Sequence, residues 1–225
     1  SSSVGCRPML VLLPPSEGKT APESGEPVDL DSLVFAEEVS EKREQVLDAL
    51  DPGLRKAPAA PAAEVYTGVL FKRLELPRLP MKARRRVLIA SALWGVVRPD
   101  DRIPRYKLPP KQKLDGIGSL AKFWRPVLAE ALPDKEGELI VDMRSGAYSA
   151  MWKPRRATLL PVRAFTESDG ERKAVSHMAK AVRGDVARAL LEAKKAPADP
   201  EVAAAITEAA GFTVEVNDGT LDVIV

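Results

Sequence analysis

The stretch VLIASALWGVVRPDDRIPRYK, residues 87–107, joins a continuous apolar run to a strongly polar loop. The apolar part, residues 87–97, is compatible with a buried strand or a core helix segment, and periodicity alone does not separate the two. We favour a strand. Two prolines stiffen the loop that follows, since each fixes φ. That loop carries four cations and a tyrosine: Arg98, Arg102, Arg105, Tyr106 and Lys107. The sequence therefore predicts a buried strand that leads into a rigid cationic rim.

Segments on either side of this stretch predict a fold of mixed α and β structure. Short apolar runs predict strands at residues 9–13, 138–143, 157–162, 212–216 and 221–225. Apolar positions at helical spacing predict helices at residues 34–50, 119–132 and 171–194. Residues 57–63 (APAAPAA) are expected to be a connector because their prolines oppose a helix. We expect an α+β fold, with helices around a mixed sheet.

The length and composition favour one domain without a membrane segment. A chain of 225 residues suits one sizeable core, and no apolar run approaches the roughly 20 residues that a membrane helix needs. Residues 1–8 resemble no signal peptide, and we expect a candidate leader there, with a single domain over residues 9–225. The only cysteine, Cys6, and the only histidine, His177, leave no basis for a thiolate or multi-histidine metal site. We therefore expect no metal, no cofactor and a cytoplasmic location.

The net charge of +2 conceals two oppositely charged regions. Residues 20–52 hold ten acids against Lys42 and Arg43, whereas residues 72–113 hold thirteen bases against three acids. Focused positive potential attracts phosphates, so the second region predicts an anionic partner. A solvated basic surface without a partner is the alternative.

The loop after the first predicted strand ends in Gly18-Lys19-Thr20, the last three residues of a phosphate-binding loop. The upstream glycine of that motif is missing, and Pro14 and Pro15 stand in its place. We therefore do not expect a nucleoside triphosphatase. Lys19 remains a candidate anion ligand, and an exposed turn is the equal alternative.

Two further segments could bind an anion or carry chemistry. Gly116 and Gly118 form a Gly-hydrophobic-Gly turn before a helix, as in helix-hairpin-helix modules that bind DNA phosphate through backbone amides. Any two-glycine turn before a helix has the same pattern, so an ordinary turn without a ligand remains the alternative.

The second segment follows the strand predicted at residues 138–143, where a ligand position is favoured. Its candidates are Asp142, Arg144, Ser145 and Tyr148. Loop capping and a core tyrosine are the alternative there.

Several separate motifs resemble the YaaA family of peroxide-stress proteins. They are Tyr66-Thr67-Gly68, Trp94-Gly95-Val96-Val97-Arg98-Pro99, Pro104-Arg105-Tyr106-Lys107, Phe123-Trp124, Tyr148 with Lys153-Pro154, and Ala179-Lys180-Ala181-Val182-Arg183-Gly184. The resemblance implies an α+β fold with a helix-hairpin-helix-like element, a basic cleft, DNA binding and a role that limits iron-driven DNA oxidation. A second lysine that the family often has is absent at Ala181-Val182, and the sequence after Ala196 departs from the family forms.

Three hypotheses follow from the residues and the resemblance. The first is a stress protein that binds DNA through its basic region, with Lys19, Arg98, Arg105, Lys107, Gly116, Gly118, Arg144, Lys153 and Arg183 as candidate ligands. The second is an enzyme that acts on a small phosphorylated, nucleotide-like or carboxylated molecule. Its candidate catalytic groups are Tyr66, Tyr106, Asp142, Ser145, Tyr148 and Lys180. The third is a purely structural or partner-binding protein. The sequence does not indicate an oligomeric state.

Overall fold

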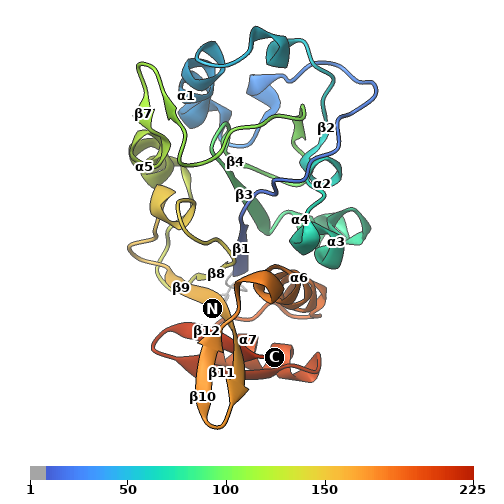
Figure 1. The fold of residues 1–225 in the computed structure, drawn as a ribbon, viewed down its shortest axis with the longest axis vertical. Helices are drawn as coiled ribbons and strands as arrows, with labels where there is room; N and C mark the ends of the chain where they lie inside the picture. Colours follow the sequence, from blue (N-terminus) through green and yellow to red (C-terminus); the bar gives the residue numbers. More distant parts are fainter. Residues whose placement is uncertain (1–8) are drawn as a thin grey trace, which may run out of the picture.

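The computed structural model describes residues 9–225, so the predicted leader with Cys6 lies outside the described residues. Its centre is a sheet that runs through the middle of an elongated molecule (Figure 1). The parallel strands are β1 (Met9–Leu13), β3 (Val87–Ser91), β8 (Leu139–Asp142), β9 (Thr158–Ser168) and β12 (Thr220–Ile224). The strand order is β11-β12-β9-β8-β1-β3-β4. The expected α+β class is confirmed, with a mostly parallel sheet.

The central strands β3 and β8 are apolar up to their last residues, Ser91 and Asp142, because both faces of the sheet are covered. All five residues of β3 and all four of β8 are buried. A parallel strand that is buried on both faces shows no apolar–polar alternation. This explains why these strands appeared in the sequence as continuous apolar runs.

The apolar run at residues 87–97 is two strands, so the prediction of one strand was wrong. The chain leaves β3 at Ser91, reverses through a tight turn, and returns as β4 (Gly95–Val97), which pairs antiparallel with β3. Gly95 has a φ of 74°, and a Cβ atom there would lie 2.9 Å from the ring of Trp124. Glycine is therefore required at the reversal. Since both strands and the turn are buried, hydrophobicity did not reveal the turn.

The long helix predicted at residues 171–194 begins later than expected. Residues Glu171–Ala174 form β10, which pairs antiparallel with the end of β9 across a turn at Asp169 and Gly170. The helix itself, α6, spans Ser176–Glu192. All four residues of β10 are exposed, so they lack the apolar residues that would have marked a strand. The C-terminal hairpin of β11 (Thr213–Asn217) and β12 is confirmed.

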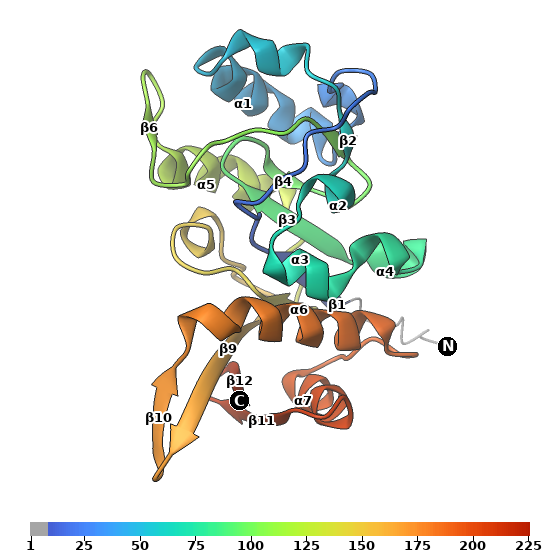
Figure 2. The same cartoon turned by 45° about the vertical axis from the view of Figure 1, so that its right-hand side comes forward.

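Figure 2 shows α1 (Ala36–Asp48) near one end of the molecule, α7 (Pro200–Ala209) near the other, and α2 (Ala62–Val65), α3 (Val69–Leu74) and α4 (Met81–Arg84) between them beside β3. Helix α1 packs against α5 (Leu120–Ala131), and α6 packs against β9, α3 and α7. Strand β2 (Ala60–Pro61) pairs with β5 (Arg102–Ile103). Within residues 9–225, no helix combines the length and hydrophobicity needed to cross a bilayer.

The glycine pair near residue 117 lies in a small hairpin. Strand β6 (Lys113–Leu114) pairs with β7 (Gly118–Ser119), and α5 follows directly. The chain between β5 and β6 contains no helix. One helix therefore adjoins this hairpin on its C-terminal side, and a helix-hairpin-helix element is not shown.

Candidate functional site

The loops that leave β1 and β8 diverge at the carboxyl edge of the sheet. From β1 the chain continues towards β3 on one side, and from β8 it continues towards β9 on the other. Adjacent parallel strands whose connections diverge in this way form a topological switch point, where open sheets most often bind ligands. The loop after β1 carries Lys19, the loop after β8 carries Tyr148, and β3 ends at this edge with Ser91.

The loop after β1 is fastened to the turn at Tyr66. Thr20 N donates to the carbonyl of Val65 at 2.9 Å, and Thr67 N donates to that of Gly18 at 3.0 Å. These bonds pair Lys19 with Tyr66 as an isolated antiparallel bridge. Ser16 adds a side-chain contact, since its Oγ accepts from Gly68 N at 2.9 Å. The two segments therefore hold Lys19 and Tyr66 beside each other.

Three buried hydroxyl groups form a chain at this edge. The hydroxyls of Tyr66 and Tyr106 lie 2.7 Å apart, and the Tyr106 hydroxyl lies 2.7 Å from Ser91 Oγ. Tyr66 is 1% exposed, Tyr106 6% and Ser91 0%. The Tyr106 ring also meets the rings of Tyr66 and Trp94 edge to face. We refer to Ser91, Tyr106 and Tyr66 as the hydroxyl chain.

Burial keeps the tyrosines of this site neutral. It raises the pKa of Tyr66 well above 10 and the pKa of Tyr106 to about 12. The pKa of Tyr148 is also raised, first by burial and then by the nearby Tyr106 and Glu17. Burial disfavours a charged phenolate because it removes the water that would solvate it. These three are all the tyrosines of the chain, and at neutral pH each offers a hydroxyl donor.

Lys19 brings a positive charge to the hydroxyl chain. Its Nζ lies 4.5 Å from the centre of the Tyr106 ring and 5.8 Å from that of Tyr66. Burial lowers the pKa of Lys19; the carboxylate of Glu17 opposes this and the guanidinium of Arg105 adds to it. Lys19 is half-buried, whereas Glu17 and Arg105 are exposed. The site therefore runs from a buried hydroxyl chain to an exposed, charged rim.

A buried ion pair shapes the loop after β8. Arg144 bonds both carboxylate oxygens of Asp142, at 2.8 and 3.0 Å, and both side chains are buried. The same guanidinium donates to the carbonyls of Tyr148 at 3.2 Å and Trp152 at 2.9 Å. Arg144 and Asp142 are thus engaged with each other and with the loop, and their contacts position Tyr148. Ser145 is exposed in the same loop.

The other predicted site residues make no hydrogen bond to the hydroxyl chain. Arg98 lines a hollow of about 170 Å³ that also includes Met9, Arg85 and Arg86, at the amino end of β1 and β3. Arg183 is half-buried and its Nε donates to the carbonyl of Val162 at 3.0 Å. Lys153 and Lys180 are exposed, and neither has a hydrogen bond or ion pair to another described residue. Arg98 and the hydroxyl chain therefore occupy opposite edges of the sheet.

The cations of residues 72–113 divide into paired and unpaired groups. Ion pairs join Arg73 to Asp185, Arg78 to Glu75, and Arg84 to Asp100. Arg102 and Arg86 donate to the carbonyls of Ala59 and Leu191. By contrast, the remaining cations are exposed and make no ion pair with any described residue: Lys72, Lys82, Arg85, Arg98, Arg105, Lys107, Lys111 and Lys113. We call the last four of these, Arg105, Lys107, Lys111 and Lys113, the basic run. It leads from Tyr106 to the β6–β7 hairpin, and a basic cleft is not shown.

The hairpin beyond the basic run has an open tip. Gly116 and Gly118 both have a φ of 75°, and nothing lies within 4 Å of a Cβ atom built at either position. Ser119, which precedes α5, makes no side-chain capping bond to the helix. The first amides of α5 therefore lack a capping side chain.

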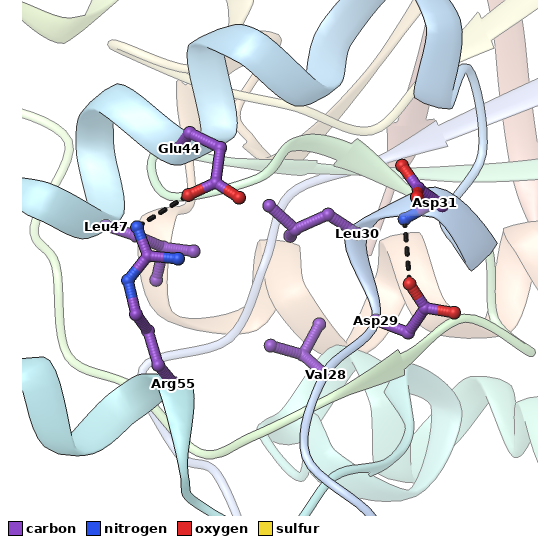
Figure 3. Close-up of a pocket in the computed structure, with 7 residues that line it drawn as sticks. All are labelled: Val28, Asp29, Leu30, Asp31, Glu44, Leu47 and Arg55. Atoms are coloured by element: carbon purple, nitrogen blue, oxygen red, sulfur yellow. Dashed lines mark hydrogen bonds and ion pairs between the residues drawn. The ribbon is translucent and has the colours of Figure 1, made fainter.

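A hollow of about 220 Å³ lies away from the hydroxyl chain, beside α1 (Figure 3). Its lining residues are Val28, Asp29, Leu30, Asp31, Glu44, Leu47 and Arg55. Arg55 pairs with Glu44 at 2.6 Å and with Asp48 at 2.7 Å, and Asp29 accepts a bond from Asp31 N. Much of its charge is thus already paired. Over residues 9–225, no cluster of His, Cys, Asp or Glu side chains is arranged to hold a metal ion.

The sequence analysis overlooked Ser91. Its hydroxyl lies at the inner end of the hydroxyl chain, and its place at the end of β3 became apparent only in the fold. A signal was present, because Ser91 is the one hydroxyl residue in the apolar run of residues 87–97. A buried polar side chain requires a hydrogen-bond partner, so a serine within this apolar run predicts a buried polar contact.

Comparison with known proteins identifies related chains. The sequence profile of the family described as peroxide stress protein YaaA matches residues 35–217. A UPF0246 protein of Streptomyces coelicolor is 40% identical, with 92% of each chain covered. A UPF0246 protein of Corynebacterium efficiens is 37% identical over 94% of this chain and 96% of its own. An uncharacterized protein of Campylobacter jejuni is 32% identical over 64% of this chain and 58% of its own.

Proposed function

Because the chain belongs to the peroxide stress protein YaaA family, we propose that it is a peroxide-stress protein that binds DNA through the basic run and the β6–β7 hairpin. The observation that carries this proposal is the basic run itself. Its four cations are exposed, make no ion pair with described residues, and lie together in residues 105–113, which lead into the hairpin. Lys72, Lys82, Arg85 and Arg98 are also exposed and unpaired, but they lie outside that stretch. Unpaired cations can exchange small counterions for phosphates without first breaking a protein contact.

The hairpin supports phosphate binding at the same place. Its glycine tip leaves space for a close approach of a phosphate to the backbone, and the start of α5 lacks a capping side chain. Backbone amides at a helix N-terminus favour a negative charge. These contacts would not depend on base sequence, so we expect binding to many duplexes with a strong dependence on salt.

The test is duplex binding by the variant that combines Lys107→Ala, Lys111→Ala and Lys113→Ala. We expect weaker binding and a slope of log affinity against log salt that is shallower by about 2 to 3, since each lost phosphate contact removes about 0.9. Fluorescence polarisation with a labelled duplex across a salt series measures both. Wild-type protein that binds no duplex at low salt would refute the proposal.

The matched control replaces three exposed lysines at the other end of the molecule, Lys173, Lys194 and Lys195, by alanine. It changes the net charge equally but leaves the basic run intact, so its salt slope should stay close to that of the wild type. Equal effects of the two triple variants would show that only net charge matters. Arg84 and Arg86 are unsuitable targets because they bond to Asp100, Leu79 and Leu191.

We further propose that DNA binding serves to limit iron-driven oxidative damage. A bacterium that lacks this protein should regain peroxide resistance when it expresses the wild-type chain or the control variant. The Lys107→Ala, Lys111→Ala, Lys113→Ala variant should not restore resistance. If all three proteins, at equal abundance, restore resistance equally, the stress role does not depend on the basic run.

A further inference from the structure

We propose that the hydroxyl chain and Lys19 form a second site, which binds the carboxylate or phosphate group of a small molecule. The group would accept a hydrogen bond from Tyr66 and lie beside the ammonium of Lys19. This site adjoins the basic run at Arg105 but differs from it in chemistry, since its donors are buried neutral hydroxyls beside the half-buried Lys19.

The bonds to Ser91 fix the direction of the first bond of the chain, the one between Ser91 and Tyr106. Its Oγ accepts from Leu93 N at 3.2 Å and from Trp94 N at 3.1 Å, which uses both lone pairs. The Ser91 hydroxyl must therefore donate its proton to Tyr106. Either hydroxyl can donate in the bond between Tyr106 and Tyr66; we assign Tyr106 as the donor and the Tyr66 oxygen as the acceptor.

With Tyr106 as the donor, the hydroxyl proton of Tyr66 can serve a further acceptor, because the Tyr66 oxygen accepts in the 2.7 Å bond to Tyr106. Tyr66 is 1% exposed. A buried hydroxyl proton is stabilised by an acceptor. An oxyanion would satisfy this donor, and the upstream hydroxyls would strengthen its bond.

The surroundings favour an anion at this point. Lys19 Nζ lies over the Tyr106 ring, and Arg105 lies close enough to influence Lys19. The raised pKa of Tyr66 and that of Tyr106 keep both hydroxyls protonated as donors at neutral pH. The loops of the switch point supply Lys19 from β1 and Tyr148 from β8. An anion here would meet neutral donors and at least one cation.

The tyrosine content of the chain allows a direct test on the wild-type protein. Only three tyrosines exist, and all three belong to this site. Labelling with tyrosine that carries ¹³C at Cζ therefore gives three NMR signals, which Tyr→Phe variants assign. The labelled protein is titrated with sodium phosphate and, in a separate experiment, with sodium acetate. Sodium chloride keeps the ionic strength constant in both titrations. We expect one of the two anions to shift the Tyr66 signal with saturation.

Variants then test the predicted direction of the chain. Tyr66→Phe should weaken binding of the active anion about tenfold or more, because it removes the donor to a charged acceptor. Tyr106→Phe should weaken it less, since Tyr66 keeps its proton. The Lys107→Ala, Lys111→Ala, Lys113→Ala variant should give the same saturation curve as the wild type at about 0.15 M salt.

Clear outcomes would overturn the inference. One is that neither anion shifts a tyrosine signal of the wild-type protein with saturation. The other is that folded Tyr66→Phe binds the anion with unchanged affinity. Because the wild-type titration needs no variant, a folding defect in Tyr66→Phe does not protect the proposal. Loss of DNA binding in the lysine variant would leave this result unaffected, so the two proposals can fail independently.

Discussion

At the scale of single residues, Arg43 is a buried arginine that bonds to the backbone. Its side chain is fully buried, and its guanidinium donates to the carbonyls of Val34, Trp94 and Val96 at 2.8 to 3.0 Å. Burial lowers its pKa to about 10, with an opposing effect from Asp101. Arg43 therefore remains charged at neutral pH and ties α1 to the β3–β4 reversal.

We expect Arg43→Ala to lower the free energy of unfolding by about 2 to 4 kcal/mol, through lost hydrogen bonds and the cavity left behind. Urea denaturation followed by circular dichroism measures this change. The matched control is Arg55→Ala, which removes an exposed ion pair and should cost less than about 1 kcal/mol. Similar losses for both variants would contradict the assigned role of Arg43.

The hydroxyl chain predicts how the tyrosines titrate. The pKa of Tyr106 is raised to about 12, and those of Tyr66 and Tyr148 are also above 10. A raised pKa in the folded state means that the neutral form is favoured by folding. The resulting stability is complete below pH 10, the ordinary value, and is lost as the pH rises towards about 12.

Absorbance at 295 nm during an alkaline titration measures this behaviour. We expect little tyrosinate at pH 10 while circular dichroism shows a folded chain. The same titration in denaturant should give the ordinary pKa near 10, since burial is then absent. A tyrosine that ionises near pH 10 in the folded protein would contradict the buried position of the hydroxyl chain.

At the scale of elements, Gly184 decides how closely α3 and α6 pack. A Cβ atom at this position would lie 2.5 Å from the carbonyl oxygen of Leu70 and 2.8 Å from Cβ of Arg73. Both values are too short for a real contact, and Leu70 O belongs to the backbone. Glycine in a helix interior normally costs about 1 kcal/mol relative to alanine. Here the close helix crossing outweighs that cost.

Gly184→Ala should therefore destabilise the protein, by about 1 to 3 kcal/mol, although alanine is the better helix former. Thermal unfolding and urea denaturation measure the sign and the size. Ala181→Gly, at a half-buried position of the same helix, measures propensity alone and should cost about 1 kcal/mol. A more stable Gly184→Ala protein would show that α3 and α6 can move apart freely.

Elements with strong local signals were predictable. The strands at residues 9–13 and 138–143, the helix around α5 and the C-terminal hairpin were identified from the sequence because apolar runs, periodicity and an Asp-Gly turn mark them locally. The reversal at Gly95 and strand β10 were not predictable. The first lies inside an apolar run, and the second has four exposed residues.

At the scale of the whole molecule, the basic sequence region separates into surfaces with different roles. Arg98 and the hydroxyl chain lie at opposite edges of the sheet, and other arginines of the region join elements through ion pairs. The basic run alone keeps unpaired charge beside an open hairpin. A charge count along the chain could not make this division, because pairing depends on residues distant in sequence, such as Arg73 and Asp185.

The sequence by itself determined the α+β class, the family and the residue types of the candidate site, because these depend on local patterns and motifs. Tyr66, Tyr106, Tyr148 and Lys19 were all named before the fold was seen. Only the tertiary structure decided that they meet, since they lie on separate loops at one edge of a parallel sheet. It alone also added Ser91, whose hydrogen bonds fix the direction of its bond to Tyr106. That direction is a property of contacts between distant segments, and no local pattern encodes it.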